Sequence, residues 1–418
     1  MSHVDMSHLD TTHLDLNAVH GGKEMTAQDI PFPLISPFRL VSREETLVAR
    51  GLRHRLAPVP TDGLAEAVRV FWDRHAGTSL LVGALPFDRA APCHLFAPDR
   101  HERSPTPVRQ APAAPYDARW TATEQPTAAV YADTVSRALE RLSDAAGSPL
   151  RKVVLARSLL LQGAAPIDID AIVANLALDP AITTYTVPLP VDSADGAPRT
   201  LVGATPELLV DKRGEAVESF PLAGSAPRSP DGATDRAAAE SLLQSEKDHR
   251  EHAAVVEAIL DTLSPYCRTL HAPQQPELVS TASMWHLGSR ITGTLRDPSV
   301  SAAELASVLH PTPAVCGLPR RAAREAIARL ETFDRGFFAG AVGWTDRKGD
   351  GRWLVAIRCA EISDATARLY AGAGIVPGSD PQAEAHETGA KFSAMLNALG
   401  LSPAAIDMHL TRQQEDEP

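Results

Sequence analysis

Two β-hairpin patterns constrain the fold of this 418-residue chain more than any other feature of its sequence. The turn DKRG separates apolar segments at residues 201–210 and 216–221, and the turn DRKGDG separates segments at residues 340–344 and 353–359. Charged turns that contain glycine and lie between such runs are typical of hairpins. The two patterns therefore predict antiparallel β-sheets.

Helical segments are interspersed with these hairpins. Residues 151–161 predict one more buried strand, because they are apolar and rich in β-branched side chains. The sequence predicts helices at residues 127–146, 233–264, 301–309, 319–330 and 381–399. Long helices among hairpins predict an α+β fold with large antiparallel sheets, and not a regular βαβ array.

Composition limits the class of protein and its partners. A chain of 418 residues that is 44% hydrophobic can bury a large core in one or two domains. Its formal net charge of −12 argues against nucleic acid and anionic membrane as partners. The sequence has neither an apolar run long enough to span a bilayer nor a secretory signal pattern. We therefore predict a cytoplasmic enzyme.

The four cysteines are scattered along the chain and form no CxxC pair; they are Cys93, Cys267, Cys316 and Cys359. This usage predicts buried thiols in a reducing compartment, and neither a disulfide framework nor a zinc site.

Residues 371–391 (AGAGIVPGSDPQAEAHETGAK) hold the most informative chemistry in the chain. Gly372, Gly374 and Gly378 predict a glycine-rich turn, where the backbone can approach a ligand closely. Asp380 and Pro381 then predict the start of a helix, since Asp can cap a helix and Pro suits its first turn.

Three charged residues of this helix share one face. Glu384, Glu387 and Lys391 are spaced i, i+3 and i+7. Two carboxylates and an ammonium beside free backbone N–H groups predict a site for a divalent cation and an organic anion. The alternative is a solvated helix face with an ordinary Glu–Lys pair.

A second pair of carboxylates follows an i, i+3 spacing on another predicted helix. Asp248 and Glu251 lie beside its apolar stripe and could face Glu384 and Glu387. Four hard oxygen donors from two helices suit Mg²⁺. His252 points about 100° away from Glu251 and is predicted to pack or to form hydrogen bonds. The alternative for the pair is a charged surface flank.

Three charged residues occur next to apolar segments. Lys152 lies in a predicted strand, where it is either a buried amine that can act as a general base or an edge residue that reaches water. Glu207 follows a proline turn, where it is either a partly buried general acid or a solvated residue at the start of a strand. Arg358 is flanked by apolar residues and needs an anionic partner, either a substrate carboxylate or a protein acid such as Glu361.

Nine segments together resemble one enzyme family. In chain order they are KVVLAR, GATPELLV, PLAGSAPR, SEKDHREH, MWHLGSRITG, HPTPAVCGLPR, FFAGAVGW, WLVAIRCAEI and AGAGIVPGSDPQAEAHETGAKF. They resemble the chorismate-utilising enzymes, which include isochorismate synthases, salicylate synthases, anthranilate synthase large subunits and aminodeoxychorismate synthases. The likeness is greatest to the isochorismate synthases of catechol siderophore (2,3-dihydroxybenzoate) pathways. It covers residues 152–391, whereas the first 120 residues resemble the family weakly, apart from residues 82–88.

This resemblance implies a fold, a cofactor and a set of site residues. The fold would be one large domain of two stacked antiparallel sheets flanked by helices, with the site between the sheets. The resemblance implies that chorismate binds with Mg²⁺, that Lys152 is the base that activates water, and that Glu207 is the acid that protonates the leaving hydroxyl. It implies metal ligation by Glu251, Glu384 and Glu387, with Asp248 as a further acidic position. The implied substrate-binding residues are Gly224, Ser225, His286, Ala314, Phe338, Arg358, Gly372, Gly374 and Lys391.

The implied organisation has four parts. Residues 1–30 form a disordered tail, and residues 31–125 form the N-terminal part of the domain, with a Pro-rich loop near 98–126. Residues 126–405 form the chorismate-binding catalytic region, and residues 406–418 form a flexible tail. The resemblance also implies a monomer.

Three functions are considered for these residues. The first is isochorismate synthase, in which water attacks C2 of chorismate and the C4 hydroxyl leaves. Amine-transferring relatives usually carry Thr near Ala314, and the anthranilate type carries Gln at the position of Lys152. The second is salicylate synthase, which also eliminates pyruvate. The third is a catalytically silent protein that binds an organic dianion and Mg²⁺. It predicts the loss of Lys152 or Glu207, and both residues are present.

Overall fold

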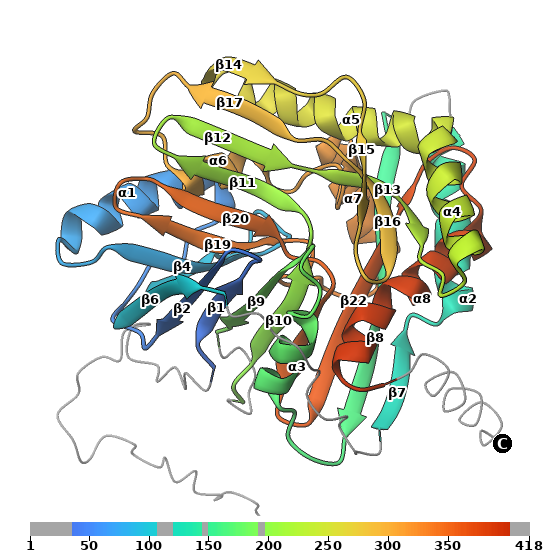
Figure 1. Cartoon of the computed structure of the whole chain (residues 1–418), viewed down its shortest axis with the longest axis horizontal. Helices are drawn as coiled ribbons and strands as arrows, with labels where there is room; N and C mark the ends of the chain where they lie inside the picture. Colours follow the sequence, from blue (N-terminus) through green and yellow to red (C-terminus); the bar gives the residue numbers. More distant parts are fainter. Residues whose placement is uncertain (1–35, 107–119, 144–148, 191–196, 402–418) are drawn as a thin grey trace, which may run out of the picture. The chain divides into compact units, whose positions relative to one another are not determined.

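The computed structural model describes residues 36–106, 120–143, 149–190 and 197–401. These residues belong to one compact unit, with two large antiparallel sheets, a small third sheet and eight α-helices (Figure 1). The predicted α+β fold in a single domain is confirmed. The predicted tails at 1–30 and 406–418 lie outside the described residues, and the division near residue 125 stays a prediction.

The first large sheet has ten strands. Its order is β18 (Gly317–Leu318), β8 (Lys152–Gly163), β22 (Thr366–Ile375), β21 (Cys359–Ser363), β10 (Thr200–Thr205), β9 (Thr183–Pro188), β1 (Phe38–Val41), β2 (Glu45–Arg50) and β6 (Arg100–Pro105), while β7 (Trp120–Gln125) also pairs with β8. The strand predicted at 151–161 is β8.

The other two sheets have nine and three strands. The nine-stranded order is β14 (Cys267–His271), β17 (Ile291–Leu295), β12 (Ala216–Phe220), β11 (Leu208–Arg213), β20 (Gly351–Val355), β19 (Ala341–Asp346), β4 (Leu80–Leu85), β5 (His94–Ala97) and β3 (His54–Arg55). The three-stranded order is β13 (Leu222–Pro227), β16 (Met284–Gly288) and β15 (Glu277–Ser280).

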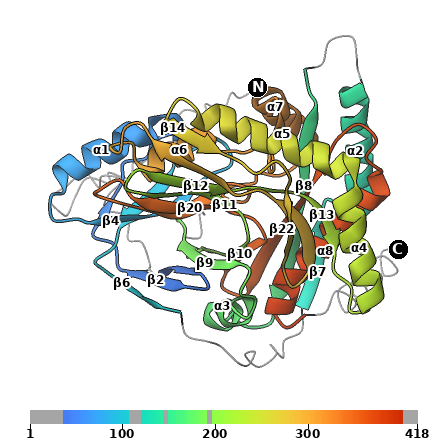
Figure 2. The ribbon, with the colours of Figure 1, turned by 45° about the horizontal axis from the view of Figure 1, so that its top comes forward.

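The helices cover the faces of these sheets. They are α1 (Leu64–Arg74), α2 (Ala128–Ser143), α3 (Ile169–Leu176), α4 (Gly232–Gln244), α5 (Glu246–Leu263), α6 (Ala302–Leu309), α7 (Arg320–Leu330) and α8 (Pro381–Ala398). Helices α3 and α8 enclose a core on the ten-stranded sheet that includes Leu161, Val202 and Phe392. A larger core joins both large sheets with α1 and α6. Helix α5 runs alongside β13, β14 and β16 (Figure 2).

One pair of strands continues from the ten-stranded sheet into the nine-stranded sheet. Strand β10 pairs with β21 in the first sheet, and the strands next to them in sequence, β11 and β20, pair in the second. The chain crosses between the sheets at residues 206–207 and again at residues 356–358. The prediction of continuous strands at 201–210 and 353–359 was therefore wrong, although the two hairpin turns are present.

The prediction of one helix at 233–264 was also wrong. The segment forms two helices, α4 and α5, which are separated at Ser245. The backbone of Ser245 is extended (φ −73°, ψ 104°), and its side chain accepts a hydrogen bond from the N–H of Asp248 at 3.2 Å. Ser245 thus acts as the N-cap of α5, a role that serine serves better than a position inside a helix.

Two predicted loops are partly strands. Within residues 98–126, β6 and β7 pair with neighbouring strands, and residues 107–119 lie outside the described residues. The edge strand β6 is mostly exposed and ends in Pro105, where a missing N–H costs no ladder bond. Gly372 and Gly374 lie in β22 and not in a turn; only Gly378, with φ 90°, has the left-handed conformation of a turn glycine.

Candidate active site

One cavity lies where the large sheets meet β13, α5 and α8. Fourteen of the fifteen predicted site residues line it: Glu207, Gly224, Ser225, Asp248, Glu251, His286, Ala314, Phe338, Arg358, Gly372, Gly374, Glu384, Glu387 and Lys391. Lys152 does not line this cavity but contacts Glu251, which does. Residues from distant parts of the sequence therefore converge around one cavity.

Glu207 is buried at one of the two crossings between the sheets. Its side chain is almost inaccessible, with the residue 3% exposed, and Oε1 has no hydrogen-bond partner among the described groups. Burial raises the pKa of Glu207 to about 8, although Lys152, the backbone N–H of Leu222 and Arg358 act in the opposite direction. The carboxyl group is therefore mainly protonated at neutral pH, and the alternative of a solvated glutamate is excluded.

Lys152 begins β8 and is 3% exposed. Its Nζ lies 2.9 Å from Oε1 of Glu251, close enough for an ion pair but without the alignment of a hydrogen bond. Gly374 leaves room for this pair, since a Cβ there would lie 2.8 Å from Oε1 of Glu251 and 3.1 Å from Cε of Lys152. The alternative of an edge lysine that reaches water is excluded.

The carboxylates on α8 are held by lysines and by a hydroxyl group. Asp380 caps α8 by accepting a hydrogen bond from the N–H of Ala383, as predicted. Nζ of Lys391 lies 2.7 Å from Oε1 of Glu387, and Oγ of Ser225 donates to the same oxygen at 2.8 Å. Nζ of Lys247 lies 3.4 Å from Oε1 of Glu384.

These acids differ in their affinity for protons. Burial, followed by the charge of Glu387, raises the pKa of Glu384. Burial, followed by the charge of Glu251, also raises the pKa of Asp248, where a hydrogen bond with Ser245 acts in the opposite direction. Burial would raise the pKa of Glu387 as well, but Lys391 and Ser225 outweigh burial and lower it. The acids therefore repel one another, and a cation between them would relieve this repulsion.

The donor chemistry of this region fits Mg²⁺. Within the described ranges, no three His, Cys, Asp or Glu side chains stand together as a ready coordination shell. The predicted set of four carboxylates is thus not assembled around one point, and three of the four contact lysines. Mg²⁺ is usually held by one or two carboxylates with water and substrate oxygens, so Glu251, Glu384 and Glu387 can supply what it needs.

Positive and neutral groups surround another part of the cavity. Arg358 is buried in the left-handed conformation (φ 49°), which costs an L-residue roughly 1–2 kcal/mol. Its guanidinium donates to Oγ1 of Thr281 at 2.9 Å and to Nε2 of His286. Burial, and then the nearby charges of Arg358 and Lys391, lower the pKa of His286 well below its usual value, so the neutral imidazole can accept this bond.

Arg358 forms no ion pair with a described carboxylate. Glu361, the predicted alternative partner, instead pairs with Arg199 at 2.5 Å. A buried guanidinium without a protein counter-ion is suited to bind a carboxylate of a ligand. Lys391 adds a second cation, and its Nζ also donates to the carbonyl oxygen of Gly372 at 2.8 Å.

Aromatic and small side chains form the apolar wall of the cavity. The rings of Phe338 and Tyr370 stack with centroids 5.0 Å apart and an angle of 8°. Arg335 lines the cavity next to the Phe338 ring. It donates to the carbonyl oxygens of Val315 and Val154 and pairs with Glu331. A flat apolar surface of this kind suits one face of a carbon ring.

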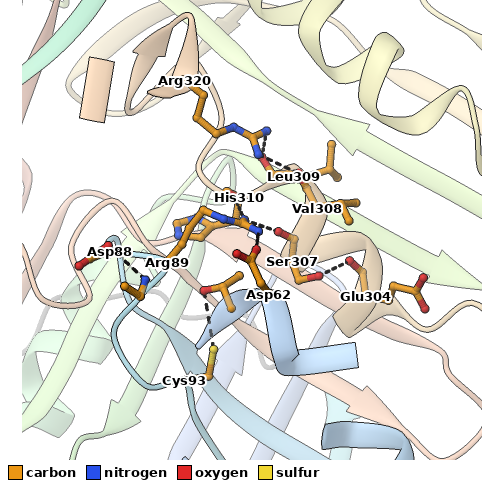
Figure 3. Close-up of polar contacts among 12 residues, drawn as sticks. Asp62, Asp88, Arg89, Cys93, Glu304, Ser307, Val308, Leu309, His310 and Arg320 are labelled. Atoms are coloured by element: carbon orange, nitrogen blue, oxygen red, sulfur yellow. Dashed lines mark hydrogen bonds and ion pairs between the residues drawn. The ribbon is translucent and has the colours of Figure 1, made fainter. Parts of the chain in front are cut away.

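The loop that carries Ala314 is anchored by two arginines (Figure 3). Arg89 donates to the carbonyl oxygens of Ser307 and His310, and Arg320 donates to those of Val308 and Leu309. These carbonyls belong to the last turn of α6 and its cap, which lack partners within the helix. Nε2 of His310 lies 2.9 Å from the carbonyl oxygen of Pro86. The start of the loop is therefore fixed relative to the nine-stranded sheet.

Sequence reasoning missed four residues of the site. Lys247, Tyr370 and Arg335 line the cavity, and Thr281 orients Arg358. Lys247 lies inside the motif SEKDHREH, and Tyr370 directly precedes AGAG. Both residues are adjacent in sequence to predicted site residues or motifs, and this adjacency could have identified them. Thr281 and Arg335 lie outside such patterns. His252 forms a buried hydrogen bond with Ser289 at 2.8 Å, as predicted.

The chain belongs to the family of chorismate binding enzymes, whose profile matches residues 74–400. The converging acids, the cationic region and the apolar wall occupy this matched region.

All four cysteines are buried and free, and within the described residues no helix has the length and apolarity needed to cross a membrane.

Among individual relatives, the isochorismate synthase DhbC of Bacillus subtilis is 46% identical over 349 residues, which is 81% of this chain and 85% of the relative. The isochorismate synthase EntC of Escherichia coli K12 is 39% identical over 352 residues, which is 84% of this chain and 86% of the relative. One similar crystal structure is that of a protein from Bacillus anthracis, provisionally named a 2,3-dihydroxybenzoate-specific isochorismate synthase. It has a TM-score of 0.81 at 41% sequence identity, and the match covers 87% of this chain and 96% of that protein's chain.

Proposed function

We propose that this chain is an isochorismate synthase, an isomerase that converts chorismate to isochorismate for the synthesis of a catechol siderophore. The observation that carries the proposal is the buried carboxyl group of Glu207, whose pKa is raised to about 8. Hydroxide is a poor leaving group, so departure of the C4 hydroxyl needs a proton from a neutral acid. Glu207 holds that proton at neutral pH.

Lys152 is the proposed general base. Water is a poor nucleophile, and a neutral amine can take its proton as the oxygen bonds to C2. The proton given by Glu207 leaves with the C4 oxygen as water. One water molecule is thus consumed and one is released, and product and substrate are isomers.

Mg²⁺ is the proposed cofactor, held by Glu251, Glu384 and Glu387 with Asp248 nearby. When bound, it would neutralise a carboxylate of the substrate against a protein whose formal net charge is −12. Arg358 and Lys391 are proposed to hold carboxylate oxygens, and the wall formed by Phe338 and Tyr370 is proposed to face the ring. Ser225 positions Glu387, because its Oγ donates to Oε1 of Glu387. Gly224 lies against Asp248, since a Cβ at Gly224 would be 3.0 Å from Cβ of Asp248.

The second candidate is a salicylate synthase, which would also eliminate pyruvate. The names of the relatives favour isochorismate as the product. A binding protein without catalysis is disfavoured, since Lys152 and Glu207 are both present and both buried. We further propose a cytoplasmic monomer that does not bind nucleic acid.

Product analysis tests the proposal. Purified protein is incubated with chorismate and Mg²⁺, and the products are separated by chromatography. Isochorismate as the only new product supports the proposal. Salicylate with an equal amount of pyruvate would replace it with the second candidate, and unchanged chorismate would refute both.

A further inference from the structure

A second cavity lies on the other side of the pair formed by Lys152 and Glu251. Its volume is about 590 Å³, and it lies between α5, the start of β8 and residues 376–377. Glu251 and Lys247 line both this outer cavity and the proposed substrate cavity, whereas Lys152 lines only the outer one. The pair thus forms part of the wall between the two cavities.

Helix α5 shapes the outer cavity through one stripe of its surface. Glu251, Ala254, Ala258 and Asp261 recur at intervals of three or four residues, so they share a face of the helix, and all line the cavity. The two alanines leave space beside Lys152. Arg151, Arg250 and Glu257 add charged groups to the lining. Charges of both signs around small side chains suit water better than an apolar ligand.

The proposed reaction needs water at Lys152 while the substrate fills the inner cavity. The water released at C4 forms beside Glu207, at one of the crossings between the sheets, whereas Lys152 lies at the start of β8. A bound ring with two carboxylates separates these points. The attacking water therefore needs an approach to Lys152 that does not pass through the substrate.

Lys152 is placed to receive water from this side. An ammonium or amine group has several hydrogen-bonding positions, and Nζ of Lys152 forms no aligned hydrogen bond with a described group. Its only ion pair in the described part of the chain is with Glu251. Nζ is covered in this conformation, so a small movement of either side chain is needed to open the wall.

We infer that the outer cavity, lined by Lys152, Glu251, Ala254 and Ala258, delivers the attacking water to Lys152 while substrate occupies the inner cavity. This inference rests on the proposed function. Water is then the ligand of the outer cavity. The small side chains of Ala254 and Ala258 keep the route to Lys152 open.

The test fills the outer cavity with larger side chains. In Ala254→Leu and Ala258→Leu, we expect kcat for isochorismate formation to fall roughly tenfold, about 1.4 kcal/mol in activation free energy. We expect the KM for chorismate and the Mg²⁺ concentration for half-maximal activity to stay unchanged, because neither alanine lines the inner cavity. Ala253→Leu is the matched control, since Ala253 is exposed on the same helix and does not line the outer cavity.

A merely structural effect would give a different pattern. Displacement of α5 would move Asp248 and Glu251, and would raise the KM or the Mg²⁺ requirement together with any fall in kcat. That pattern overturns the inference, as does a kcat equal to that of Ala253→Leu in protein shown to be folded by thermal unfolding. If either leucine variant does not fold, Ala254→Val and Ala258→Val are measured instead, with the same expected changes in kcat, KM and Mg²⁺ requirement. Failure of the proposed function is distinct, because the unaltered protein would then form no isochorismate.

Discussion

Glu207 and Arg358 lie on the two neighbouring crossings by which the chain passes between the large sheets, and backbone hydrogen bonds tie the crossings together. The N–H of Val355 donates to the carbonyl oxygen of Glu207 at 3.1 Å, and the N–H of Ala204 donates to that of Arg358 at 3.1 Å. The strand pairs β10–β21 and β11–β20 continue on either side. The proposed acid and the proposed carboxylate-binding group are therefore fixed relative to each other by backbone.

Removal of the proposed base should stop turnover without unfolding the protein. For Lys152→Ala, we expect kcat to fall by about 10²–10⁴, the usual contribution of general acid–base catalysis. The measurement is isochorismate formation under saturating chorismate. Lys348→Ala, an exposed lysine in a turn, serves as the control and should keep full activity. Wild-type turnover by Lys152→Ala would remove this residue from the mechanism.

The protonation of Glu207 should appear in the pH dependence of both catalysis and stability. An acid with a pKa of about 8 is protonated below pH 8, so we expect kcat to decline as the pH rises through about 8. Glu207→Gln should lower kcat by about 10²–10⁴, since an amide cannot deliver the proton.

The same pKa sets the direction in which the free energy of unfolding changes with pH. The native state holds a proton on Glu207 that the unfolded state, with an ordinary glutamate pKa, releases at lower pH. This residue's contribution to the free energy of unfolding should therefore be largest at acidic pH and should decline between about pH 4.5 and pH 8. Glu207→Gln should lose less stability over this range in urea unfolding. Parallel profiles for the two proteins would contradict the assignment.

Removal of the divalent cation should abolish activity. We expect no turnover after exhaustive EDTA treatment, recovery with Mg²⁺, and a higher melting temperature with Mg²⁺, because a ligand that binds the native state stabilises it. Glu384→Gln and Glu387→Gln should raise the Mg²⁺ requirement at least about tenfold. Glu246→Gln is the control on α5, since Glu246 is exposed and pairs only with Arg250 among the described residues. Full activity in EDTA would refute the metal assignment.

Loss of the Arg358 guanidinium should weaken substrate binding. In Arg358→Lys, we expect the KM for chorismate to rise about 10- to 100-fold, since a hydrogen bond to a charged group contributes about 1.5–3 kcal/mol. Arg199→Lys is the comparison, because Arg199 pairs with a protein carboxylate and does not line the cavity. Equal KM values for the two variants would show that Arg358 does not bind substrate.

The buried pair Arg335–Glu331 should contribute to stability more than an exposed pair near it. The side chains of Arg335 and Glu331 are 2% and 3% exposed, and Arg335 also bonds two backbone carbonyls. Arg335→Met should lower the free energy of unfolding by about 3–5 kcal/mol, because it leaves a buried carboxylate without its partner. Arg321→Met breaks the exposed pair with Glu325 on α7 and should cost less than about 1 kcal/mol. Similar losses in urea unfolding would contradict the expected role of burial.

Local sequence patterns determined much of the secondary structure and the shared face of α8. The cap at Asp380, the face of Glu384, Glu387 and Lys391, and the two hairpin turns depend on residues a few positions apart, whose geometry the backbone sets. The co-linear motifs went further and identified the family and most of the residues that line the cavity.

Only the tertiary structure decided how these residues act together. The break of an apolar run into β10 and β11 at Glu207, the ion pair of Lys152 with Glu251, and the bonds of Arg358 to Thr281 and His286 all depend on partners far away in sequence. Burial sets the pKa of Glu207, and burial is a property of the packed sheets. A short segment fixes which chemical groups are available and which way a helix presents them, while desolvation and pairing arise only when distant segments exclude water together.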